Sequence, residues 1–115
     1  MLFILYPGLG HSNQNEFNEA LNYHNQALEM CQRLHNGDHV DIAVYLSNVG
    51  AAYNKLQQWN KSLEYHTKCL EMRRRLFSGD HDKIAFTLNE IGKMKYSRQR
   101  YLTKQIKVII VRQRI

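Results

Sequence analysis

The sequence has little proline, little cysteine and no long hydrophobic run, and each shortage excludes a class of structure. Proline occurs once in 115 residues, at Pro7, while residues that favour helices are plentiful. This composition disfavours a loop-rich β fold and predicts an all-α protein. Cys31 and Cys69 are too few and too far apart for a disulfide framework or a zinc site, so we expect a reducing, cytoplasmic compartment.

The apolar stretches are short. Residues 2–6 lack a basic start and are shorter than the apolar core of a secretory signal, and residues 108–111 are shorter than any membrane span. We expect a soluble protein without a cleaved signal.

Acidic residues are scarce in the second half of the chain. Residues 1–58 hold two basic and five acidic side chains, a net charge of −3. Because the whole chain has a net charge of +6, residues 59–115 carry +9. Such an asymmetry is typical of chains that meet an acidic partner, a nucleic acid or an anionic membrane.

The clearest feature of the sequence is an internal repeat. Residues 17–58 align with residues 59–100 without a gap, at a period of 42. Many aligned pairs are identical, among them Leu21/Leu63, Tyr23/Tyr65, His24/His66, Leu28/Leu70, Met30/Met72, Gly37/Gly79, His39/His81, Leu46/Leu88 and Gly50/Gly92.

Each repeat unit predicts two helices, because its apolar residues recur at helical spacing. Gly37 and Gly79 suit helix C-caps, and the acidic and histidine residues that follow suit the next helix start. Short connections predict antiparallel neighbours. The expected helices run from about Glu16 to His35, Val40 to Lys55, Trp59 to Phe77 and Asp82 to Tyr96.

The repeat resembles a known family. Its large, small and aromatic positions match the tetratricopeptide pattern at Leu46, Val49, Gly50, Tyr53, Trp59, Ser62, His66 and Cys69. The 42-residue period and the linker-plus-helix string GDHVDIAVYLSNVG are similar to the kinesin-light-chain class of these repeats. The resemblance covers about residues 16–97 and implies a right-handed α-solenoid of antiparallel helical hairpins.

The ends depart from the pattern. Residues 1–15 read as a degenerate remnant, in which Pro7 stands where a helix interior is expected, and residues 98–115 as a basic C-terminal tail. The tail is either disordered or a basic amphipathic helix. Two complete hairpins fall below the three or so repeats normally needed, so we expect a fragment of a longer repeat protein or self-association through uncapped ends.

The resemblance also implies a functional surface, the concave groove lined by the first helix of each repeat. Position by position, a partner protein or peptide would meet Val44, Ser47, Ala51, Asn54, Lys55, Phe86, Asn89, Lys93 and Tyr96. Amide and hydroxyl groups suit a peptide backbone, and lysines suit acidic side chains. The alternative is that these are merely solvated helix residues.

No catalytic pattern is present in the sequence: it has no phosphate-binding glycine loop, no nucleophile elbow and no zinc-binding helix. We therefore expect no enzyme, cofactor, metal or small-molecule substrate. His24 and His66 suit an aromatic packing position, and His39 and His81 suit helix starts. The run Arg73–Arg75 suits a solvated C-terminal helix turn.

Two functional hypotheses follow. The first is a protein-interaction scaffold that binds a peptide or partner protein in the groove, as a kinesin-light-chain-like adaptor fragment. The second is a basic module that associates with nucleic acid or an anionic membrane through its C-terminal half.

Overall fold

The protein is built from four α-helices and, over the residues described, no strand. The computed structural model describes residues 10–114, with side chains from Gln14 onward. The expectations for residues 2–6 and Pro7 lie outside this range. The helices are α1 (Gly10–Leu34), α2 (Val40–Lys55), α3 (Trp59–Leu76) and α4 (Asp82–Arg114).

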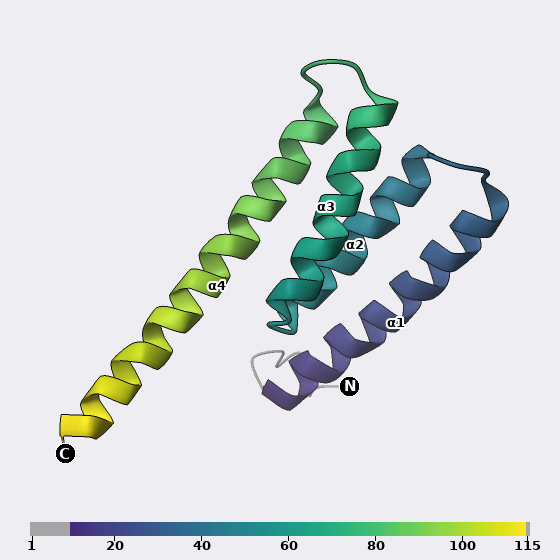
Figure 1. Ribbon diagram of the computed structural model, residues 1–115. Coiled ribbons are helices and arrows are strands. Elements are labelled where there is room, and N and C mark those ends of the chain that lie inside the picture. Colours follow the sequence, from purple (N-terminus) through teal and green to yellow (C-terminus); the bar gives the residue numbers. More distant parts are fainter. Residues whose placement is uncertain (1–9, 115) are drawn as a thin grey trace.

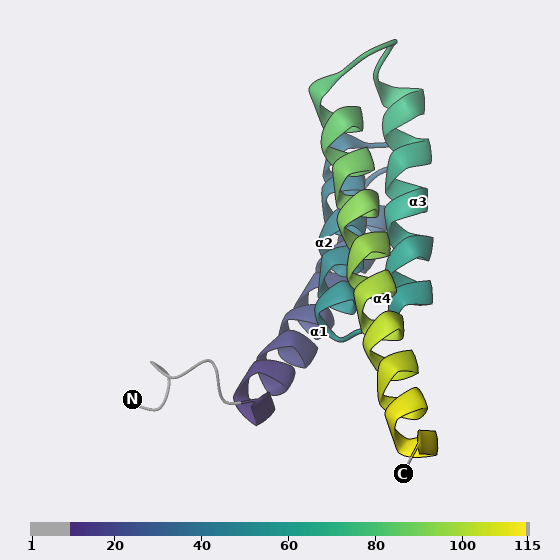
Figure 2. The same cartoon turned by 90° about the vertical axis from the view of Figure 1, so that its left-hand side faces the viewer.

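Consecutive helices pack against one another in antiparallel order, and α2 also contacts α4 (Figure 1). The second view shows α4 running past the lower end of α3 (Figure 2). The chain measures 58 × 39 × 21 Å along its principal axes. The predicted fold class, an all-α tetratricopeptide-like solenoid of about two repeats, is confirmed.

The linkers use the predicted glycine and histidine chemistry. Gly37 and Gly79 adopt φ values of +89° and +59°, a left-handed conformation that favours glycine. The His39 ring accepts a hydrogen bond from the Asp41 backbone N–H at 3.0 Å, and the His81 ring accepts one from Lys83 at the same distance. Both histidines thus satisfy a free N–H at a helix start, as predicted.

The core is centred on α2. Ile42, Ala43, Leu46 and Val49 are buried there, against Leu28 and Cys31 of α1 and Cys69 of α3. The imidazole of His66, which is 1% exposed, lies directly against Gly50. The small residue in α2 therefore allows the aromatic ring of α3 to approach the backbone, and the predicted packing role of His66 is confirmed.

Buried polar contacts fix α3 to both of its neighbours. The Ser62 hydroxyl donates to the Gly50 carbonyl at 2.8 Å, and the Cys69 thiol donates to the Ala43 carbonyl at 3.2 Å. On the other side, the Arg73 guanidinium donates to the Thr87 hydroxyl at 2.7 Å. These bonds satisfy polar groups that would be costly to bury alone.

Two predicted helix boundaries were wrong. The first helix begins at Gly10 instead of Glu16, and the last continues to Arg114 instead of ending at Tyr96. The expected tail, residues 98–115, is therefore helical as far as Arg114, although its side chains are exposed beyond Arg98. Neither glycine nor proline follows Gly92 to end the helix, and Trp59 packs on Tyr101 with ring centroids 6.2 Å apart. No helix within residues 10–114 is long and apolar enough to cross a membrane.

His66 makes stability depend on pH. Burial lowers its pKa below the ordinary value of 6.5, an effect that Glu90 partly opposes. The unfolded chain therefore takes up a proton at a pH where the folded chain does not, and protonation favours unfolding. We expect the urea midpoint to fall as the pH drops from about 7.5 through 6.5.

The matched variants are His66→Gln and His24→Gln. The first should lower stability overall but flatten this part of the pH profile, whereas the second should leave the slope in place. An unchanged slope in His66→Gln would contradict the assignment.

Candidate functional site

The predicted groove residues lie on α2 and α4, where the two helices run side by side, and most of them line one of two hollows. The one nearer the N-terminal ends of α2 and α4, here called the upper hollow, has a volume of about 600 Å³. Val44 and Phe86 flank it as exposed apolar side chains, and Arg73 of α3 also lines it. The remaining residues that line it are Ser47, Asn48, Ala51, Asp82, Lys83 and Glu90.

The lower hollow lies further along the same two helices and differs in chemistry. It has a volume of about 380 Å³ and is lined by three cationic side chains, Lys55, Arg100 and Lys104, with no acidic residue among its lining residues. Besides Lys55, two more of the predicted groove residues, Asn54 and Tyr96, line this hollow. Its remaining lining residues are Gln57, Trp59, Ser97 and Tyr101. The upper hollow exposes apolar side chains among charged residues of both signs, and we call it the apolar hollow. The lower one, in which every charged lining residue is a cation, is the cationic hollow.

Two predicted residues line neither hollow. Asn89 is exposed on α4, and Lys93 is held by Glu90 through an ion pair of 3.3 Å on the same helix. Because this pair is exposed and lies within one helix, it contributes little to stability.

Arg73 was predicted to be solvated, and that prediction was wrong. The residue is 4% exposed, and its guanidinium donates to the Thr87 hydroxyl and, at 3.5 Å, to the Lys83 carbonyl. The helical spacing of the sequence could have predicted this burial, because Arg73 continues the buried series of α3 formed by Ser62, His66 and Cys69.

Its two neighbours in the basic run remain exposed. Arg75 makes a two-pronged contact with Asp38, at 2.6 and 3.0 Å, which joins the end of α3 to the linker between α1 and α2. The same contact lowers the pKa of the Asp38 carboxyl, chiefly through the hydrogen bond from Arg75. This carboxylate therefore stays ionised at neutral pH.

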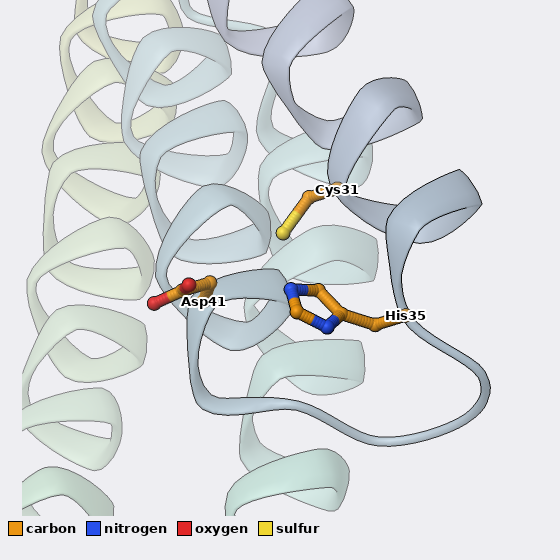
Figure 3. A group of neighbouring side chains, drawn as sticks. All are labelled: Cys31, His35 and Asp41. Carbon is orange, nitrogen blue, oxygen red and sulfur yellow. The ribbon is translucent and has the colours of Figure 1, made fainter.

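A cluster of possible metal-ligand atoms lies where α1 meets α2. The side chains of Cys31, His35 and Asp41 lie near one another, with one donor atom of each within 4.8 Å of the others (Figure 3). Each has a structural role as well. Cys31 belongs to the core, His35 stacks on His39 with ring centroids 3.5 Å apart, and the exposed Asp41 is the acidic residue in the first turn of α2.

The protonation of the Cys31 thiol also favours these structural roles. Burial and the nearby Asp41 raise the pKa of the Cys31 thiol, whereas a metal ligand must be the thiolate. Three donors are also one fewer than a closed structural zinc site takes. We assign Cys31 and His35 to packing and Asp41 to the start of α2.

Helical hairpins stacked in sequence, with a groove along alternate helices, define an α-solenoid repeat protein. A family model described as Tetratricopeptide repeat matches residues 8–56 and residues 41–102, which together span most of the chain. The chain therefore belongs to the tetratricopeptide repeat family. Repeats of this family generally mediate protein–protein interaction. A search of curated proteins gave no match, and neither did a search of solved structures.

Proposed function

We propose that this protein binds an extended peptide segment of a partner protein in the groove between α2 and α4. The observation that carries the proposal is the division of the groove into an apolar hollow and a cationic hollow in line with each other. An apolar peptide side chain would enter the upper hollow between Val44 and Phe86. Acidic side chains further along the peptide would meet Lys55, Arg100 and Lys104.

The groove offers the two kinds of interaction that would hold such a peptide, apolar burial and hydrogen bonds from cations. Val44 and Phe86 are exposed, so covering them with a peptide side chain removes apolar surface from water. The cations of the lower hollow give charge-assisted hydrogen bonds to carboxylates. In the upper hollow Arg73 adds a guanidinium that donates only to uncharged oxygens of the described residues.

Selection from a displayed library of random peptides, using the 115-residue protein as bait, tests the proposal. The enriched peptides should share an apolar residue followed or preceded by acidic residues. Phe86→Ala should weaken the binding of such a peptide about 10-fold, since an interface residue of this kind contributes on the order of 1–2 kcal/mol. Replacing Lys55, Arg100 and Lys104 together by Gln should remove most of the salt dependence of binding.

Leu102→Ala is the matched control, because Leu102 is an exposed apolar residue of α4 that lines neither hollow. Its affinity should equal that of the unchanged protein. Enriched peptides without a shared apolar-plus-acidic pattern, or full affinity in Phe86→Ala, would show that the groove is not the binding surface.

Within the family, we propose a kinesin-light-chain-like adaptor, since the 42-residue period and the GDH linkers support that class. Asn89 and Lys93, which line neither hollow, would contact the peptide backbone and its acidic groups. Cys31 and Cys69 are both free and buried, which supports the proposed cytoplasmic location.

A second candidate function rests on the helical segment 98–114. Its side chains are exposed from Gln99 onward. Leu102, Ile106 and Ile109 recur at helical spacing on one side, and Arg100, Lys104 and Lys107 lie on the other. This arrangement favours adsorption to an anionic membrane surface. Co-sedimentation with anionic but not neutral vesicles would favour this candidate, whereas salt-sensitive binding to RNA alone would favour a nucleic acid.

A further inference from the structure

The two outer helices each expose a face whose counterpart is covered in the middle of the stack. The repeat relates α1 to α3 and α4 to α2, so residues 17–34 of α1 and residues 82–97 of α4 each have an equivalent 42 positions away. In Figure 1, α1 and α4 lie at the two edges of the molecule, with α2 and α3 between them. Comparing equivalent residues shows what each outer face would accept.

On α4 the open face is the one that α2 uses to hold α3. Leu46 is 4% exposed, whereas its equivalent Leu88 is 47% exposed. Gly50 receives the His66 ring, whereas a Cβ at Gly92 would have no neighbour within 4 Å. The α4 face is therefore shaped to accept a helix like α3, but no helix within residues 10–114 covers it.

On α1 the open face is the one that α3 uses to pack on α2. Tyr65 stacks on Tyr53 with ring centroids 5.6 Å apart, and Tyr65 and Met72 both pack against the core. Their equivalents, Tyr23 and Met30, are 68% and 57% exposed. The α1 face is therefore shaped to accept a helix like α2.

The two outer helices also carry opposite net charge. Within α1, Glu16, Glu19 and Glu29 outnumber Arg33, and Glu19 stands where α3 has Lys61. Within α4, nine basic residues face only two acidic ones, Asp82 and Glu90. Opposite charges steer association and oppose the pairing of two identical faces.

We propose that the occupant of the α4 face is α1 of a second copy of this chain, so that copies associate head to tail and continue the solenoid. In the joined pair, His24 of one copy enters the space at Gly92 of the other, as His66 does at Gly50. Tyr23 meets Lys95, at the position where Tyr65 meets Tyr53. The contact is heterologous, so it extends into longer assemblies instead of stopping at a dimer. It uses faces separate from the two hollows and does not depend on the proposed peptide binding.

Sedimentation equilibrium of the full chain and of two blocked variants tests this arrangement. Tyr23→Lys/Met30→Lys places like charge against α4 and blocks the α1 face. In Leu88→Gln/Gly92→Gln, the first change makes an exposed apolar position of the α4 face polar, and the second fills the space at Gly92, where added atoms meet nothing within one chain. Val40→Lys, on an exposed side chain outside both faces, is the control.

The unchanged protein and the control should form species larger than dimers, and these should dissociate between about 0.05 and 0.5 M salt because charge attraction is screened. Each blocked variant alone should be monomeric with an unchanged helical circular dichroism spectrum. An equimolar mixture of the two should form dimers containing one of each and nothing larger.

Three results would overturn the proposal. They are a monomeric wild-type chain at the highest soluble concentration, a wild type that stops at dimers, or a dimer formed by either blocked variant alone. The last would indicate a symmetric contact between identical faces. The mixture also controls for folding, since each blocked chain must supply one intact face.

Discussion

Gly50→Ala should destabilise the protein by about 1–3 kcal/mol, because it overpacks a close contact in the core. A Cβ at Gly50 would lie 2.9 Å from Cδ2 and Nε2 of His66, closer than real Cβ contacts. The ring has little freedom to move away, since it is 1% exposed and packed between helices. Either the imidazole leaves its position or α3 separates from α2. Equilibrium urea denaturation would measure the loss.

Gly92→Ala is the matched control at the equivalent repeat position. Here the added methyl group meets open space, so only the helix preference of alanine acts. We expect a gain of about 0.5–1 kcal/mol, measured at dilute concentration. The two identical substitutions should therefore change stability in opposite directions. Equal effects at both positions would contradict the packing difference described for the two glycines.

Leu46→Ala should cost about 2–4 kcal/mol, the usual result of emptying a buried leucine site. Leu46 lies in the core beside Val49 of α2 and Leu28 of α1. The cavity cannot collapse easily, because helices on both sides of α2 hold its walls. A decrease in the urea midpoint with an unchanged denaturant slope would show lost stability without a change in the native surface.

Leu88→Ala replaces the identical residue of the next repeat and should change stability by less than about 1 kcal/mol. Nearly half of the Leu88 surface is already in water, so little burial is lost. If the two leucines proved equally sensitive in dilute solution, the exposed α4 face would have to be covered within a single chain. That result would contradict both this prediction and the proposed head-to-tail contact.

The helical fold was predictable because it depends on local signals that the repeat presents twice. Apolar spacing predicted four helices, and the glycine and histidine residues of the linkers predicted how helices end and begin. Those roles are confirmed at Gly37, Gly79, His39 and His81. Arg73 was misjudged, because composition alone treats a run of three arginines as solvated. Only its place in the buried face of α3 separates it from Arg74 and Arg75.

The groove was predictable only as a list of positions. Their division into an apolar and a cationic hollow depends on Arg100, Tyr101 and Lys104, which belong to the part of α4 that was expected to be a tail. The sequence contained no stop signal there, but its drift from the repeat pattern hid the continuing helix. A hollow formed by side chains of three helices has no signature along the chain.

The amino-acid sequence by itself determined the period, the helical hairpins, the linker chemistry and the uneven charge, since each follows from neighbours within one or two helical turns. Tertiary structure decided the surroundings of identical residues at equivalent positions of the two repeats. Gln57 has φ +60° just beyond the end of α2, whereas Gln99, its equivalent, continues α4. Likewise, Leu46 is buried in α2, whereas its equivalent Leu88 is exposed in α4. The α3 helix packs back on α2, whereas none of the helices in the described part of the chain packs on the same face of α4, so identical residues have different surroundings.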